Sequence, residues 1–91
     1  MATQHIVPLN LDTVIATMES RPESRARSNA WEWLAEQSAV TFDGDALLIP
    51  SRTWSGTTYR ATPTACTCQA RAHCWHKEAA QIVQDALRKS A

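Results

Sequence analysis

The first part of the sequence spaces its apolar residues as an amphipathic helix does. Leu11, Val14, Ile15 and Met18 recur at intervals of three and four residues, which places them on one face of a helix. Asn10 comes directly before this run, and an asparagine side chain can accept a hydrogen bond from a free backbone N–H of the first turn. We therefore predict a first helix with Asn10 as its N-cap.

A second helix is predicted over about residues 22–38. Pro22 interrupts the first helix and suits the first turn of the next one. The apolar face of the second helix has Ala26, Ala30 and Leu34 at its centre and Trp31 and Trp33 at its two edges. The N-terminal helical part is therefore expected to cover about residues 10–38.

After this part the pattern changes to that of short strands. Two apolar runs, residues 39–42 and 46–49, flank Asp43-Gly44-Asp45, and Asp-Gly between apolar runs is a strong signal for a hairpin. A second turn near Ser55-Gly56 leads to a third strand over about residues 57–62. The pattern predicts a small three-stranded antiparallel sheet.

The last segment, from about residue 75 to residue 89, is helical again. One face of this helix is apolar, and a polar stripe lies on another face. The apolar face consists of Ala79, Ile82, Val83, Ala86 and Leu87. The predicted fold class is α+β: two N-terminal helices, the three-stranded sheet, a knuckle that carries metal ligands, and a C-terminal helix. A chain of 91 residues is expected to form a single domain, residues 1–91.

Composition supports a folded domain with an extra stabilising element. Hydrophobic residues make up 44 % of the chain, and a chain this short buries only about 60–65 % of its unfolded surface, so a metal, a disulfide or a partner is expected to help hold it. No apolar run approaches the roughly 18 residues of a membrane span. The N-terminus lacks the pattern of a signal peptide. We expect a cytoplasmic protein that does not enter membranes, with reduced thiols that are available to a metal.

All three cysteines lie in one short window with two of the three histidines. Cys66, Cys68, Cys74 and His76 fall within TACTCQARAHCWHKEA, and three thiolates with one imidazole form a typical tetrahedral zinc ligand set. Residues two apart on a straight strand point to opposite faces, so residues 66–68 must bend into a tight knuckle. Cys74 is expected just before the last helix, where the helix N-terminus favours a thiolate, with His76 in the first turn.

Other readings of the window explain it less well. A disulfide leaves one cysteine over, and one activated catalytic thiol leaves two unexplained. Four protein ligands fill the coordination shell, which indicates one structural Zn²⁺. His73 could replace His76 as the fourth ligand; we prefer His76 because it lies in the turn that must close on the metal.

The spacing C-x-C-x(5)-C-x-H, after a strand that carries Tyr59 and before an Ala-rich helix, resembles a SWIM-type zinc finger. The similarity extends upstream: ESRARSNAWEWLAEQSAV resembles the helix that often precedes the finger in prokaryotic members, and LLIPSRTWSGTTYRAT resembles their hairpin. About residues 22–84 are covered, and the finger itself is expected at about residues 39–89. Similar fingers occur in transposases, chromatin-remodelling ATPases, ubiquitin ligases and recombination accessory proteins, and they are thought to bind DNA or proteins.

Charge is distributed unevenly along a chain whose formal net charge is zero. Residues 1–50 carry three arginines and seven acidic residues, whereas residues 51–91 carry six basic and two acidic residues. A basic half suits an anionic partner. Basic and aromatic side chains near the finger suit nucleic acid, and the candidates are Arg52, Trp54, Arg60, Arg71 and Lys77.

Two functions follow from these observations. The first is a zinc module that binds DNA with low specificity, as an accessory factor in recombination or in a mobile element. The second is a protein–protein adaptor in which zinc is purely structural. We predict no enzymatic activity and no small-molecule substrate, because the sequence contains no paired carboxylates, no glycine-rich phosphate loop and no catalytic triad, and only two glycines.

Overall fold

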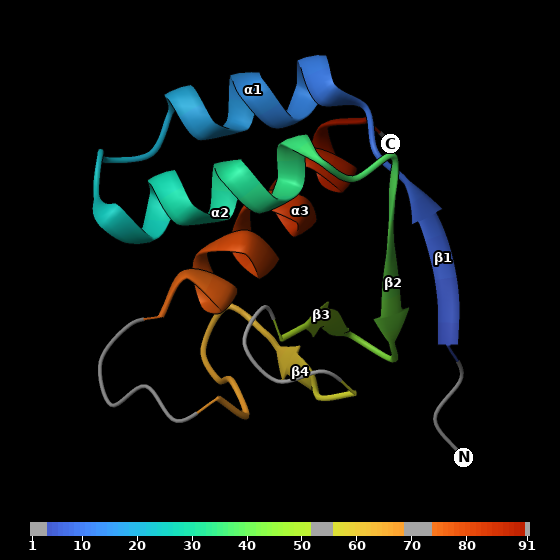
Figure 1. The fold of residues 1–91 in the computed structure, drawn as a ribbon. Helices are drawn as coiled ribbons and strands as arrows, with labels where there is room; N and C mark the ends of the chain where they lie inside the picture. Colours follow the sequence, from blue (N-terminus) through green and yellow to red (C-terminus); the bar gives the residue numbers. More distant parts are fainter. Residues whose placement is uncertain (1–3, 52–55, 69–73, 91) are drawn as a thin grey trace.

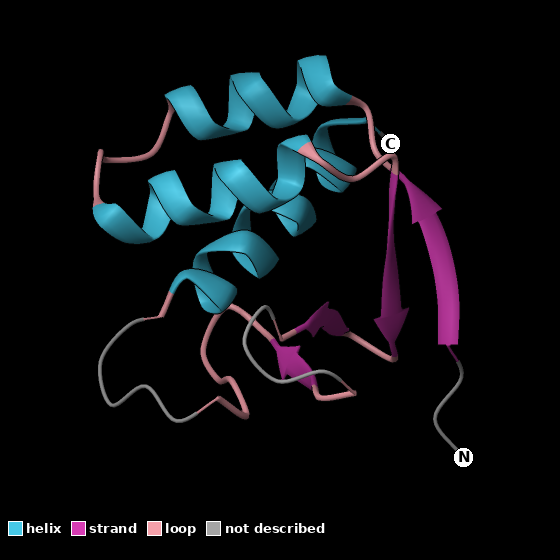
Figure 2. Ribbon diagram, viewed as in Figure 1, coloured by secondary structure: helices cyan, strands magenta, loops and turns pink. Residues whose placement is uncertain are grey.

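The computed structural model describes residues 4–51, 56–68 and 74–90. Helices lie on one side of the molecule and strands on the other (Figures 1 and 2). The elements follow in the order β1 (Gln4–Pro8), α1 (Leu11–Glu19), α2 (Arg25–Ala35), β2 (Ala39–Asp43), β3 (Ala46–Pro50), β4 (Thr58–Ala61) and α3 (Trp75–Ser90). The α+β class and the predicted order from the first helix to the last are confirmed.

Side-chain caps set the start of both N-terminal helices. Asn10 caps α1 as predicted, since its Oδ1 accepts from the backbone N–H of Asp12 at 3.0 Å and of Thr13 at 3.3 Å. The second helix is shorter than the predicted 22–38 and runs from Arg25 to Ala35. It begins later because Ser24 is its N-cap, with the Ser24 hydroxyl accepting from a first-turn N–H at 3.1 Å.

In the part of the chain that the structure describes, the sheet has four antiparallel strands in the order β1-β2-β3-β4, so the prediction of three strands is wrong. The additional strand, β1, precedes α1 and pairs with β2 from Gln4↔Asp43 to Pro8↔Ala39. The sequence QHIVP hardly alternates and has only two apolar residues besides proline, so its strand character comes from pairing with β2.

The predicted hairpin between β2 and β3 is confirmed. Asp43 and Ala46 pair across a two-residue loop, and Gly44 has a φ of 63° there. A positive φ at the first loop position is what a type II′ hairpin turn needs, and glycine supplies it without strain.

One hydrophobic core joins the inner face of the sheet to the three helices. α3 packs against α1, α2, β3 and β4, and α1 runs antiparallel to α2 beside it (Figure 1). The fully buried side chains of largest volume include Leu34 of α2, Leu47 and Ile49 of β3, and Ile82 of α3. Of the two tryptophans predicted at the edges of α2, Trp33 is buried, whereas Trp31 is partly buried against the core. In the described part of the chain, no helix is long and apolar enough to cross a membrane.

Candidate metal centre

The chain reverses direction between β4 and the first two cysteines. The Thr62 N–H donates to the Ala65 carbonyl at 2.8 Å, and this turn brings Cys66 back beside Ala61 as an isolated antiparallel bridge. The Thr67 N–H then donates to the Arg60 carbonyl at 3.1 Å. The predicted knuckle is therefore built by a short segment that folds back along the outer edge of β4.

Cys74 and His76 are positioned by the start of α3. Cys74 directly precedes the helix, and its carbonyl accepts the Glu78 N–H at 3.4 Å. His76 follows in the first turn, and both side chains are buried. This is the placement predicted from the sequence, and it lets two residues that are two positions apart face the same point.

The structure brings together the four predicted ligands. The Sγ atoms of Cys66, Cys68 and Cys74 and a ring nitrogen of His76 all lie within 4.8 Å of one another, and the three cysteines form no disulfide. Sulfurs at the corners of a zinc tetrahedron with bonds near 2.3 Å would be roughly 3.8 Å apart. The cluster thus already has nearly the size of a tetrahedral metal site.

Protonation at the cluster also fits a cation. Burial raises the pKa of the Cys66 thiol to about 12, and the nearby thiols of Cys68 and Cys74 add to this rise, while a backbone hydrogen bond at Cys68 opposes it. Three clustered sulfurs cannot readily carry negative charge together unless a cation compensates them. Burial also lowers the pKa of His76, which favours the neutral imidazole that binds metals.

Aromatic rings enclose the histidine. The His76 ring centroid is 4.2 Å from that of Trp75 and 4.9 Å from that of Tyr59. Among the described residues, no hydrogen-bond partner reaches the buried Nδ1 of His76. An unsatisfied buried nitrogen is costly, and a metal ion could satisfy it. The residues present therefore fit a metal of the zinc type, whereas His73, the other candidate for the fourth ligand, lies outside the described residues.

The structure describes two of the five residues that were predicted to contact nucleic acid. Arg60, on the outer face of β4, forms an ion pair at 2.5 Å with the buried Asp43 and keeps half of its side chain exposed. Lys77 is half-buried in the first turn of α3. The other three candidates, Arg52, Trp54 and Arg71, lie outside the described residues.

A groove beside the cluster contains residues that the sequence pattern did not indicate. It has a volume of about 400 Å³, and α2 contributes Arg25 and Asn29 while Cys68 and His76 line its other side. Both α2 residues lie on the polar side of a helix that is far from the cysteines in sequence. No local spacing signals this approach, because it depends on how α2 packs against α3.

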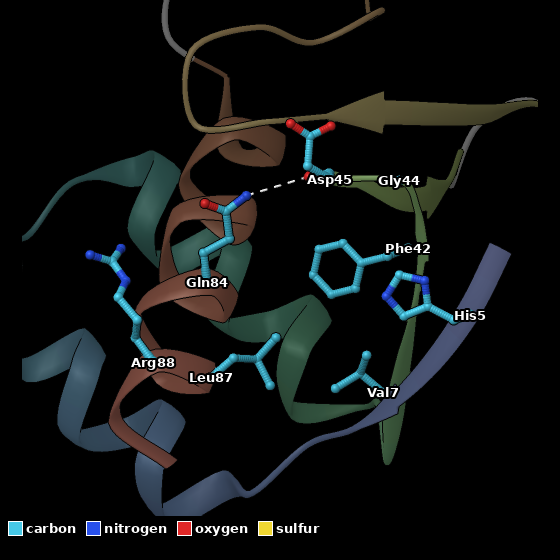
Figure 3. Close-up of a pocket in the computed structure, with 8 residues that line it drawn as sticks. All are labelled: His5, Val7, Phe42, Gly44, Asp45, Gln84, Leu87 and Arg88. Atoms are coloured by element: carbon cyan, nitrogen blue, oxygen red, sulfur yellow. Dashed lines mark hydrogen bonds between the residues drawn. The ribbon is translucent and has the colours of Figure 1, made fainter. Parts of the chain in front are cut away.

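A second groove lies away from the cluster, between the sheet and the C-terminal part of α3 (Figure 3). Val7, Phe42 and Leu87 form its apolar lining, its volume is about 570 Å³, and the His5 ring stacks on Phe42 with centroids 5.7 Å apart. Gln84 donates to the Asp45 carbonyl at 3.4 Å across one end. None of the four candidate metal ligands is among the described residues that line this groove.

Comparison of the chain with known proteins gives no relative: no protein-family model, no curated protein and no solved structure matches it. The cluster geometry and the local electrostatics are therefore the basis for a functional proposal.

Proposed function

We propose that this chain is a small zinc-binding module of the SWIM type, in which Cys66, Cys68, Cys74 and His76 hold one structural Zn²⁺. The observation that carries the proposal is the approach of all four ligand atoms to within 4.8 Å. When bound, the metal supplies a cross-link between the β4 knuckle and the first turn of α3. Binding free energy at such a site adds to folding free energy, which suits a chain this short.

The metal content is the direct test. Protein that has been refolded with zinc should carry one zinc per chain by elemental analysis. Cys68→Ser should lower this content strongly, whereas Ala65→Ser, an exposed knuckle position without a ligand, should leave it unchanged. Well under one equivalent in the refolded wild type would contradict the proposal.

We further propose that the module binds nucleic acid weakly and with low sequence specificity, as an accessory DNA-binding factor. The groove beside the cluster supports this, because the exposed Arg25 and the partly buried Asn29 line it. Guanidinium groups pair with phosphate oxygens, and nearby aromatic residues can stack on bases. Arg60 contributes less than its charge suggests, because Asp43 already pairs with it.

Fluorescence anisotropy with a labelled single strand tests this function. We expect about four basic side chains near the finger to neutralise one phosphate each. Each neutralised phosphate adds roughly 0.7–0.9 to the slope of log affinity against log salt, so the slope should be about 3 in magnitude. Arg25→Ala should reduce the slope by about one without changing the zinc content. Arg88→Ala is the matched control, because Arg88 lies near the opposite end of α3 and pairs with Asp85, so its slope should equal that of the wild type.

A protein adaptor is the second candidate, and a groove between α1 and α2 favours it. Ile15, Met18 and Trp31 line this groove, and Ile15 and the neighbouring Leu11 expose about 40 % of their surface. Zinc would then be purely structural. Full zinc loading with no binding to any DNA or RNA at low salt would favour the adaptor over the nucleic-acid module.

A further inference from the structure

The register of β1 identifies the backbone groups that it leaves at the edge of the sheet. The Leu9 N–H donates to the Ser38 carbonyl at 3.0 Å, and these residues are opposite each other when the β1–β2 register is extended by one position. Backbone groups of successive residues on an antiparallel strand point alternately to its two sides. The backbone groups of His5 and Val7 therefore bond to β2. The residues whose backbone groups point away from β2, toward the open edge, are Gln4, Ile6 and Pro8.

The two edges of the sheet differ in how they are covered. At the β4 edge, the Arg60 N–H donates to the Thr67 hydroxyl at 3.0 Å, and the Arg60 carbonyl accepts the Thr67 N–H at 3.1 Å. At the β1 edge, no hydrogen bond from any described residue reaches the outward backbone groups, and no helix or strand lies beyond the strand (Figure 1). The knuckle thus covers the β4 edge at Arg60, and nothing in the described chain covers the β1 edge.

The side chains of β1 do not protect this edge. Ile6 is 73 % exposed and is the most exposed of the large hydrophobic residues described. β1 contains no Asp, Glu, Lys or Arg, the charged residues that commonly prevent edge strands from pairing, and of the other common protections it has only a proline, at its last position. Pro8 is in the outward set, so its missing N–H removes no bond to β2.

We propose that β1 pairs antiparallel with β1 of a second copy of this chain, about a two-fold axis at Ile6. Each Ile6 N–H then donates to the Ile6 carbonyl of the other copy, and each Gln4 N–H donates to the Pro8 carbonyl. Proline provides the acceptor that this register needs, so its missing N–H leaves only the outward carbonyl of Gln4 without a donor. The two sheets become one continuous sheet through the pair.

A second copy is the occupant that the edge favours. The pairing matches the donors and acceptors of β1 to themselves, as a two-fold interface requires, and it sets the two exposed isoleucines side by side on the same face. The formal net charge of the chain is zero, so two copies meet without net repulsion. Two short strands bury far less than the roughly 1,200–2,000 Å² of stable complexes, so we expect a dissociation constant in the micromolar range or weaker.

Sedimentation equilibrium of zinc-loaded protein over a wide concentration range tests the pairing. The wild type should show a monomer–dimer equilibrium, and Ile6→Lys should weaken the dimer at least tenfold. Ala16→Lys, at an exposed position on α1 that lies outside the groove between α1 and α2, is the matched control and should dimerise like the wild type. Circular dichroism and zinc content should be unchanged in both variants. A wild type that stays monomeric throughout, or an Ile6→Lys variant that associates equally well, would overturn the proposal.

A cross-linking experiment tests the register. Directly opposed, hydrogen-bonded residues have Cα atoms about 5.5 Å apart, within the roughly 4.4–6.8 Å range of a disulfide. Zinc-loaded Ile6→Cys should therefore form a disulfide-linked dimer under mild oxidation. Gln4→Cys should cross-link much more slowly, because its symmetry mate would lie four residues away along the strand, about 13 Å. Equal rates would contradict pairing about Ile6.

Discussion

Arg21, in the turn after α1, forms a bidentate ion pair with the carboxylate of Glu78 in the first turn of α3. Nε of Arg21 donates to one carboxylate oxygen of Glu78 and Nη2 donates to the other, the latter at 2.8 Å. The Glu78 side chain is only 6 % exposed. The backbone N–H of Glu78 donates to the carbonyl of Cys74, one of the four candidate metal ligands. The pair therefore fastens the helical hairpin to the helix turn that presents two of the four candidate ligands.

Arg21→Ala should destabilise the protein by about 2–4 kcal/mol, because the variant leaves a buried carboxylate without its bidentate ion pair. Urea unfolding of the zinc-loaded protein measures the free energy of unfolding. Arg88→Ala, which removes a far more exposed ion pair, should cost no more than about 0.5 kcal/mol. Equal losses in the two variants would show that the Arg21 pair contributes no more than a surface contact.

Zinc removal should abolish cooperative unfolding of β3, β4 and α3, because the metal supplies folding free energy at a site that the short core does not hold alone. Thermal melts followed by circular dichroism, with and without a strong chelator, measure this. Cys74→Ser should behave like the chelated wild type, and Ala65→Ser should melt like the zinc-loaded protein. A thermal transition that is unchanged after verified removal of zinc would contradict a structural metal.

His76→Ala should weaken zinc binding far more than His73→Ala, because His76 is buried within the cluster of ligand atoms. Competition with a chromophoric chelator gives the two affinities. Losing one of four ligands commonly costs several kcal/mol at sites of this class, so we expect a difference of at least about tenfold, or 1.4 kcal/mol. Equal losses, or the reverse order, would contradict His76 as the fourth ligand.

Zinc affinity should rise with pH, because the metal binds thiolates and must displace thiol protons. Burial raises the pKa of Cys66 to about 12 in the folded site, and an unburied thiol titrates near ~8.5, so below about pH 8 this thiol is protonated in the metal-free protein whether or not the site is folded. Binding there releases its proton, and affinity should increase at least about tenfold per pH unit. Chelator competition at several pH values measures the slope of log affinity against pH, which gives the number of protons released per zinc ion bound. Cys66→Ala should lower this number by about one. An affinity that does not change with pH would show that the thiolates exist before the metal arrives.

The sequence predicts the site better than it predicts the sheet. The Asn10 cap, the hairpin at Gly44 and the group of three cysteines and His76 depend on interactions between residues that are close in sequence, so spacing and residue type suffice to locate them. β1 escaped prediction because QHIVP becomes a strand only by pairing with residues 39–43.

The surface around the cluster depends on tertiary packing in the same way. The approach of Arg25 to the cluster follows from the packing of α2 on α3, and the pairing of Arg60 with Asp43 spans a strand between them. Neither relationship has a local signal in the sequence. A list of basic residues near the cysteines therefore misses a nearby cation and includes one whose charge is already paired.

The knuckle that folds back along β4 has a consequence for assembly. A sheet with one open edge can form a closed pair and then stop, whereas a sheet with two open edges can add copies in both directions without limit. Cys66 and Thr67 belong to the segment that covers the β4 edge, and the proposed metal would hold that segment in place. Metal loss would release that segment and leave the outermost remaining strand uncovered, so zinc starvation would appear first as filaments or precipitate.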